Sequence, residues 1–315
     1  MVVGRSLIVT LSICGAAYGQ SVAPAPGTAF DPETRLGVDE YRREGPVGFQ
    51  VYAQGSHDFD ADLDNSGESA VSRFGAGVGV EWEAATNLIF RFAFDAEWSD
   101  YDFSGPVALI GADASPWEDV QSYRFAPSVQ IGLEARWALL VGGDVRVAYE
   151  PGADVGDALM GGGYVGARYQ WTDAFALTFG VSAQSQLEDD TIVLPLIAVE
   201  WDMTDRLRLE SRGVGLGLTY KLSDQFDVTL RGSYDPRSYR LSEDRALNPE
   251  GVVNDDRVVV GAELTWRPAA FVVVSLFAGA NLWQEYEILN SSGGKITDNE
   301  SDPSPAIAAR ATFRF

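Results

Sequence analysis

The feature that most restricts the fold of this chain is a two-residue alternation of apolar and polar side chains. Between Leu88 and Trp98 every second residue is apolar, and the residues between them include Arg91, Asp95 and Glu97. Successive side chains of a β-strand point to opposite faces, so this segment is predicted to form a strand with one apolar and one charged face. The segment Ser72–Trp82 repeats the pattern.

The alternating segments recur as pairs joined by a short polar turn. One pair is GVGVEWEAATNLIFRFAF, and the others begin at Ile131, Val165, Ile197, Leu216 and Gly261. Repetition of one hairpin unit indicates a single sheet of antiparallel strands. Between the pairs lie longer segments rich in Asp, Glu, Ser, Gly and Pro, which predict long acidic loops at the opposite end of the strands.

Six such turns account for twelve strands. One strand before the first pair (Val47–His57) and one after the last (Pro305–Phe315) bring the predicted number to fourteen. The segment Arg206–Leu222 is the weak point, because it must hold two strands and a turn near Ser211–Gly213. Each of these strands would be shorter than the roughly 9–11 residues of a tilted membrane crossing. A twelve-strand arrangement is therefore the alternative.

Aromatic residues decide which face of the strands meets water. Aromatic residues next to the predicted turns and at the C-terminus form one level, and Trp98 and Trp283 fall near the other. Amphipathic aromatic rings collect where lipid meets water, and membrane barrels carry such a belt at each end. A soluble core gives no reason for this banding. The predicted membrane-interface aromatics are Trp82, Trp137, Trp171, Trp201, Trp266 and Phe315.

These patterns predict an all-β fold, a single antiparallel up-and-down transmembrane β-barrel with short periplasmic turns and longer acidic extracellular loops. In hydrocarbon every backbone N–H and C=O needs a partner, so the first and last strands should pair and close the sheet. The barrel is predicted to cover residues 47–315.

The N-terminal segment carries an export signal. Arg5, an apolar run from Leu7 to Ala17 and the small residues Ala17 and Gly19 predict a signal peptide over residues 1–19. Residues 20–46 are rich in Pro, Gly and charge, and predict an extended leader. The only cysteine, Cys14, would leave with the signal peptide.

Charge and composition exclude several functions. The net charge of −23 provides no basic face for nucleic acid. One cysteine and one histidine exclude a disulfide framework and a multi-histidine metal site. We expect no nucleic-acid partner and no cofactor, except that the alternating carboxylates Asp60, Asp62 and Asp64 suggest a calcium loop. Asn65 and Val71 stand where a helix–loop–helix calcium site needs Gly and Glu, so a solvated acidic loop is the simpler interpretation.

The charged faces of the strands supply candidate lumen residues. Mixed signs are compatible with a pore that selects solutes by charge, and equally with a lumen closed by ion pairs. Gly75, Gly77 and Gly79 on this face favour open space, although glycine also permits strand bending. The candidates are Arg73, Glu81, Arg91, Asp95, Glu97, Glu134, Arg136, Asp144, Arg146, Arg168, Arg208, Glu210, Asp227, Arg231, Glu263 and Arg310.

The chain resembles an uncharacterised family of bacterial outer-membrane β-barrel domains, known mainly as a domain of unknown function. The hairpin units carry the resemblance, and the segment GVGLGLTYKLSDQFDVTLRGSYDPRSYRL from Gly213 is the nearest part. The resemblance implies a barrel in the cell outer membrane, in contact with its lipid, and no catalytic residues. The terminal strand ending in Phe315 resembles the signal that the outer-membrane assembly machinery reads.

Three functions follow, in decreasing order of support. The first is a passive porin or channel for small solutes. The second is a structural or surface-interaction barrel with a closed lumen. The third is an outer-membrane hydrolase that uses His57 beside Asp58, and it lacks a nucleophile motif such as G-x-S-x-G. We therefore expect no enzymatic activity, and the sequence leaves substrate and oligomeric state open.

Overall fold

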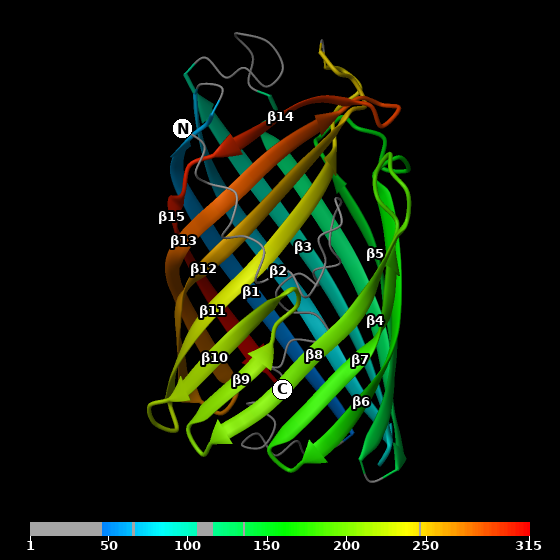
Figure 1. Cartoon of the computed structure of the whole chain (residues 1–315), viewed down its shortest axis with the longest axis vertical. Coiled ribbons are helices and arrows are strands. Elements are labelled where there is room, and N and C mark those ends of the chain that lie inside the picture. The colour runs from blue at the N-terminus through cyan, green and yellow to red at the C-terminus, as the bar shows by residue number, and fades with distance from the viewer. Residues whose placement is uncertain (1–45, 65–66, 106–115, 135, 246) are drawn as a thin grey trace, which may run out of the picture.

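The computed structural model of the chain describes residues 46–64, 67–105, 116–134, 136–245 and 247–315. The predicted signal peptide, and the predicted leader except its last residue, lie outside the described residues. The described part forms a closed antiparallel barrel (Figure 1). Its strands are β1 (Val47–Asp62), β2 (Glu68–Ala85), β3 (Leu88–Ser104), β4 (Asp119–Glu134), β5 (Trp137–Tyr149), β6 (Leu159–Thr172), β7 (Phe175–Gln184), β8 (Ile192–Thr204), β9 (Leu207–Ser211), β10 (Gly215–Lys221), β11 (Phe226–Arg240), β12 (Val252–Ala269), β13 (Val272–Leu289), β14 (Lys295–Ser301) and β15 (Ser304–Arg314).

Fourteen of these strands make the ring. Strands β1 to β13 each pair with the next one along the chain, β13 pairs with β15, and β15 pairs with β1. The short strand β14 pairs with the loop-end part of β13, and its Ser301 forms a single bridge to Leu63, which follows β1. In the closing pair Val51 lies opposite Phe313, and the N–H of Phe315 donates to the carbonyl of Phe49. The predicted fourteen-strand barrel is confirmed, and the twelve-strand alternative is wrong.

The two ends of the barrel differ in their connections. Six short turns lie at one end, which we name the turn end, and longer connections lie at the other, the loop end. The predicted weak point is a short hairpin, because β9 has 5 residues and β10 has 7. Within the described residues no helix has the length and apolar character needed to cross a membrane.

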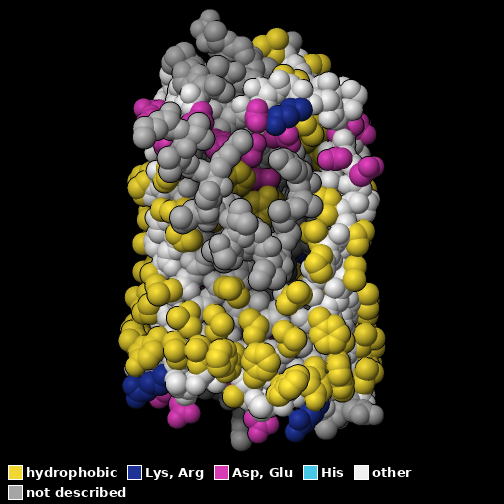
Figure 2. Space-filling model, viewed as in Figure 1, with side chains coloured by type: hydrophobic (Ala, Val, Ile, Leu, Met, Phe, Trp, Pro, Cys, Tyr) yellow, Lys and Arg dark blue, Asp and Glu magenta, His cyan; other side chains and the backbone are white. Residues whose placement is uncertain are grey.

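The outer wall near the turn end is apolar and aromatic. The predicted interface residues Trp82, Trp137, Trp171, Trp201 and Trp266 are all exposed there. Figure 2 shows a dense hydrophobic band around this end, with charged side chains at its lower rim. On a water-soluble protein such a continuous band would be an association hazard, whereas acyl chains cover it at no cost.

The strands do not stop where the apolar band stops. Strand β3 continues past Trp98 to Ser104, and β12 and β13 reach 18 residues each. Several segments predicted as loops therefore contain strand, including β14 within Leu289–Pro303. We name the part of the barrel beyond the upper aromatic level of Trp98 and Trp283 the extension.

In the extension the polar side chains lie on the outer face of the strands and the apolar side chains on the inner face. On β3, Asp100 and Asp102 are on the outer face, whereas Tyr101 is fully buried on the inner face with Phe103 beside it. Acidic side chains gather on the outside near this end (Figure 2). The hydrophobic core of the molecule thus lies inside the extension, as in a water-soluble barrel. Its members are Leu63, Val71, Tyr101, Trp117, Val120, Ala148, Met160, Leu187, Tyr239, Leu241, Val252, Val253, Tyr286, Ile288 and Leu289.

Candidate functional site: the barrel lumen

Glycines on the inner face let large neighbouring side chains lie flat across the wall. A Cβ on Gly77 would lie 2.5 Å from the ring of Tyr52, and one on Gly142 would lie 2.4 Å from the hydroxyl of Tyr164. Gln54 covers Gly75 in the same way. Gly77 and Gly79 therefore admit packed side chains rather than open space, whereas Gly75 also lines a cavity of the lumen.

Ion pairs line the lumen towards the turn end. The guanidinium of Arg91 lies 2.7 Å from a carboxylate oxygen of Glu81. Arg168 donates two hydrogen bonds to the carboxylate of Glu200, at 3.2 and 3.1 Å. Arg208 lies 2.9 Å from Glu210, which is itself completely buried. Opposite charges thus lie beside each other within one strand or between strands, so this part of the lumen wall is neutralised locally.

A second set of charges crosses the lumen at the base of the extension, and we name it the arginine–aspartate layer. Arg73 pairs with Asp58 and, at 2.9 Å, with Asp255. Arg257 also pairs with Asp58, and it lies 2.6 Å from Asp235. The layer also spans the lumen, since Arg237 on β11 pairs with Glu97 on β3. The layer consists of Asp58, Arg73, Glu97, Asp235, Arg237, Asp255 and Arg257.

The apolar core of the extension lies directly above this layer, and we name it the cap. Trp117, from the connection between β3 and β4, is fully buried against Tyr101, Phe103 and Tyr286. The hydroxyl of Tyr101 donates to Asp255 at 2.7 Å and so links the cap to the layer. Aromatic rings and buried ion pairs thus pack across the lumen at this level.

Burial in the extension changes the acidity of several groups. Burial and the nearby carboxylate of Asp255 raise the pKa of the Tyr286 phenol well above its usual value. On the outer wall just above Trp283, burial raises the pKa of Asp256 to about 7, with a contribution from Asp255. The hydroxyl of Tyr234 donates to Asp256 at 2.8 Å.

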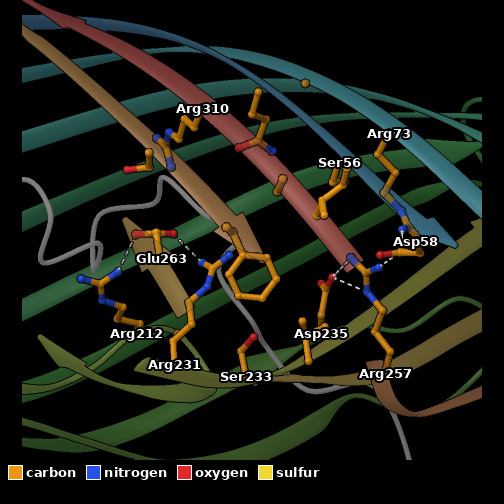
Figure 3. Close-up of a pocket in the computed structure, with 18 of the residues that line it drawn as sticks. Ser56, Asp58, Arg73, Arg212, Arg231, Ser233, Asp235, Arg257, Glu263 and Arg310 are labelled. Atoms are coloured by element: carbon orange, nitrogen blue, oxygen red, sulfur yellow. Dashed lines mark hydrogen bonds and ion pairs between the residues drawn. The ribbon is translucent and has the colours of Figure 1, made fainter. Parts of the chain in front are cut away.

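A cavity of about 200 Å³ lies under the arginine–aspartate layer and is lined by residues of β1 to β3, β10 to β13 and β15 and of the β9–β10 turn. In Figure 3, Glu263 lies between Arg212 and Arg231, at 3.5 and 3.4 Å. The guanidinium of Arg231 also lies over the ring of Phe277, with its carbon 4.3 Å from the ring centroid. The charged residues of the lining are six arginines and four carboxylates: Arg73, Arg212, Arg231, Arg237, Arg257, Arg310, Asp58, Glu97, Asp235 and Glu263.

Most predicted lumen residues lie on the inner face of the barrel. Arg310 lies over the ring of Tyr52, Asp144 pairs with Arg124 at 3.4 Å, and Asp227 pairs with Arg267. Two predicted residues do not line the described lumen. Arg136 is exposed at the turn end, where it donates to the carbonyl of Trp171, and the side chain of Glu134 lies outside the described part.

The sequence analysis missed Asp235, Arg237, Asp255 and Arg257. The sequence does contain a pattern that could have found them. In YDPRSYR and NDDRVVV an Asp and an Arg stand two residues apart, so both side chains point to the same face of the strand, and the alternation makes this the inner face. The register places them side by side: Asp235 lies opposite Arg257, and Arg237 opposite Asp255. Most of both segments lies between the hairpin units that begin at Leu216 and Gly261, where the sequence predicts loops.

The other two predicted sites are the calcium loop and the pair of His57 with Asp58. Asp60, Asp62 and Asp64 are exposed, and the described part of the chain holds no group of three His, Cys, Asp or Glu side chains placed to bind a metal ion. His57 lies on the outer face, where its Nδ1 is 2.9 Å from the hydroxyl of Ser72. Asp58 points into the lumen, so a His57–Asp58 pair is wrong.

Comparison with solved structures gives similar barrels at low identity. An outer membrane channel of the COG4313 group from Pseudomonas putida F1 is 11% identical, with 86% of this chain and 96% of that chain covered and a TM-score of 0.45. The toluene transporter TodX of P. putida is 7% identical, with 87% and 91% covered and a TM-score of 0.44. The toluene transporter TbuX of Ralstonia pickettii is 11% identical, with 86% and 90% covered and a TM-score of 0.41. The transported compounds in these names are properties of those proteins.

No curated protein sequence matches the chain. A family model described as Domain of unknown function (DUF6268) matches residues 132–315, from the end of β4 to the C-terminus and more than half of the chain. This region contains the short hairpin, most of the cavity lining and the closing strand. The chain belongs to this family of unknown function.

Proposed function

We propose that this chain is a cell outer-membrane protein that conducts small solutes through its lumen and that rests with the loop end closed. The observation that carries the proposal is the arginine-bearing cavity inside the lumen, directly beneath the cap. A barrel needed only as a scaffold gains nothing from a hollow lined by buried and half-buried charges, since each charge costs desolvation.

Membrane placement follows from the outer wall. Outer-membrane lipid covers the apolar band, and the tryptophans of the turn end lie at its periplasmic interface. The acidic loop end faces the exterior of the cell. Strand β15 carries Phe315 to the turn end, where the assembly machinery of the outer membrane would bind this terminal strand before β1 pairs with it.

The resting channel is not a wide porin. The cap fills the lumen at the loop end, and below it the arginine–aspartate layer crosses the lumen through the pair of Arg237 on β11 with Glu97 on β3. Conduction therefore requires movement of cap residues, among which Trp117 belongs to a connection rather than to a strand. Connections are the least constrained parts of a barrel, which makes this residue a suitable gate.

A structural barrel with a permanently closed lumen is the second candidate. The covered glycines and the neutralised ion pairs of the turn end favour it, because they fill the lumen rather than enlarge it. The two candidates differ in one measurable property, which is whether the folded protein passes solutes at all.

Planar-bilayer recording with purified protein tests the proposal, supported by swelling of proteoliposomes in small sugars and amino acids. We expect brief, infrequent openings of the wild-type protein and a several-fold higher open probability of Trp117→Ala. Trp171→Ala, on the exposed belt at the turn end, is the matched control and should behave as wild type. A wild-type protein that stays silent and does not swell liposomes, while it migrates as a folded barrel on unboiled gels, would establish the closed barrel instead.

A further inference from the structure

The wall of the barrel is incomplete above the β9–β10 hairpin. Strand β8 pairs with β9 only from Glu200 onwards, and β11 pairs with β10 only as far as Ser233. Above these points, in the described part of the chain, no strand lies between residues 192–198 of β8 and residues 235–239 of β11. Two strands are thus missing from this part of the wall, and Figure 1 shows the short hairpin below it.

The gap is a bounded window rather than an open seam. Its lower edge is the β9–β10 turn, where the N–H of Val199 donates to the hydroxyl of Ser211. Its upper edge is fastened by Arg240, which donates to the carbonyl of Asp157 at 2.9 Å and lies 2.6 Å from Glu188. These contacts tie β11 to the connections that follow β5 and β7.

The sequence of the flanking strands is adapted to unpaired edges. Pro195 lies within the free stretch of β8, and Pro236 lies within the free stretch of β11. Proline has no N–H to donate, so inside a sheet it is tolerated at edges and not in central strands. Each flank of the window therefore carries one residue that suits a strand without a neighbour.

The window lies at the level of the acyl chains. On the outer face Val193 and Ile197 of β8 are 63% and 54% exposed, and Leu216 at the lower edge is 47% exposed. Unpaired backbone groups in contact with hydrocarbon cost several kcal/mol each, in the general case of a membrane protein. Free edges at this depth are therefore stable only if the window is wet from the lumen or holds a molecule.

The cavity lies immediately behind the window. Its lining combines inner-face residues such as Arg231 and Glu263 with Leu216 of the outer face and with Gly213 and Val214 of the β9–β10 turn. The lining therefore reaches the lower rim of the window at Gly213, Val214 and Leu216. Neighbouring strands lie about 4.8 Å apart, so the space of two strands admits an alkyl chain.

The charge of the cavity selects among the molecules that partition into a membrane. Six arginines face four carboxylates in the lining, although the whole chain has 23 basic and 46 acidic residues. Among the cavity arginines with a measured ion pair, Arg231 has the most exposed side chain, at 27%. Its carboxylate partner Glu263 also has Arg212 beside it. Arg231 is therefore the guanidinium best placed to meet an added anionic group.

We propose that the window is a lateral portal and that the cavity behind it binds a single-chain amphiphile with an anionic head group. The head group lies at Arg231, and the apolar chain passes Leu216 towards the bilayer. The proposal rests on the proposed channel function and adds its substrate class and its route.

The head-group part is tested by calorimetry on the full-length mature protein in lipid nanodiscs. The probes are decanesulfonate, decanol and methanesulfonate, which separate charge from chain. We expect saturable binding of decanesulfonate only, and at least a tenfold weaker affinity for Arg231→Gln. Arg91→Gln, which removes a comparable ion pair near the turn end, should bind as wild type. Equal affinity for methanesulfonate, or an Arg231→Gln affinity within twofold of wild type, would overturn the proposal.

The route is tested by placing a larger side chain at the outer edge of the window. Leu216→Trp should slow the binding of decanesulfonate from preloaded nanodiscs severalfold, whereas Leu276→Trp, at an equally lipid-exposed position outside the cavity lining, should not. Equal rates for the two variants would exclude entrance through the window. If decanesulfonate fails to bind but the wild type still conducts, the portal is wrong and the channel stands. If the protein binds decanesulfonate but never conducts, the channel function is wrong and the binding site stands.

Discussion

The membrane-spanning part and the extension are built from the same strands, but the inner face is charged in the first and largely apolar in the second. On β3, the outward residues Phe92 and Phe94 are exposed on the apolar outer wall, whereas seven to ten residues later Tyr101 is buried in the lumen and Asp102 faces outward. The alternation continues without a break, so no change in secondary structure marks the boundary. Apolar residues face outward in the membrane-spanning part and inward in the extension, because the surroundings of the outer face change from acyl chains to water.

The comparison teaches that a lumen need not be polar throughout. Where lipid covers the outside, inner charges such as Arg91 and Glu81 pair across strands. Where water covers the outside, the inner face can bury apolar side chains, and the hydrophobic effect then stabilises the cap. The loop end is closed for this reason, and its closure depends on burial and not on the membrane.

The largest expected effect comes from Trp117→Ala in the cap. Truncating a fully buried tryptophan costs about 3–5 kcal/mol of unfolding free energy in typical cores. Denaturant unfolding in phospholipid bilayers, followed by gel mobility, measures the change. The same truncation at Trp171, exposed at the turn end, should cost clearly less. Equal losses at both sites would show that the cap is not a packed core.

The next effect concerns the outer face. Phe94→Arg places a charge at the acyl level and should destabilise the barrel by about 2–4 kcal/mol, as measured for lipid-facing positions of other barrels. Asp102→Arg, on the outer face of the same strand in the extension, should change stability by less than about 0.5 kcal/mol, as at ordinary surface sites. Similar costs for the two variants would remove the distinction between the two regions.

A smaller effect tests the filling of the lumen. Gly77→Ala places a Cβ against the ring of Tyr52 and should cost about 1–3 kcal/mol, the usual range for overpacking. Gly55→Ala is the control, because its Cβ would meet nothing closer than 3.8 Å. The same unfolding assay applies. A neutral Gly77→Ala variant would mean that Tyr52 does not lie across this glycine in the membrane.

The smallest effect is a pH dependence from the extension. Since the pKa of Asp256 is raised to about 7 in the folded protein, the folded state binds this proton more tightly than the unfolded chain. The contribution to stability is complete below the ordinary aspartate value of about 4 and is lost as pH rises through about 7. Asp256→Asn should therefore flatten the stability profile between pH 4 and 8, relative to wild type. An unchanged profile would contradict the raised pKa.

Much of the fold was predictable because the bilayer imposes a local pattern. Alternation, the tryptophans beside the turns and the need for closure predicted fourteen strands and the pairing of β1 with β15. Even the short strands β9 and β10 were expected, since residues 206–222 are too few for two full crossings. Each of these inferences needs only neighbouring residues and the chemistry of lipid.

The rest depends on contacts between distant segments. Trp117 and Leu241 occur in segments that look like polar loops, and their burial requires Tyr286 and Val252 from other parts of the ring. The covered glycines could not be separated from empty space without the side chains across the strand, as with Tyr52 over Gly77. The arginine–aspartate layer arises from register, which places Asp235 opposite Arg257.

One measurement tests the exchange of faces most directly. Because Cys14 is the only cysteine and lies in the predicted signal peptide, single cysteines can be placed at Phe94, Asp102 and Val71 and labelled with nitroxides in nanodiscs. We expect the label at 94 to respond to oxygen, the label at 102 to a water-soluble nickel complex, and the label at 71 to neither. A label at 94 that responds to the nickel complex, or a label at 102 that is shielded from it, would contradict the assignment of lipid to one region and water to the other.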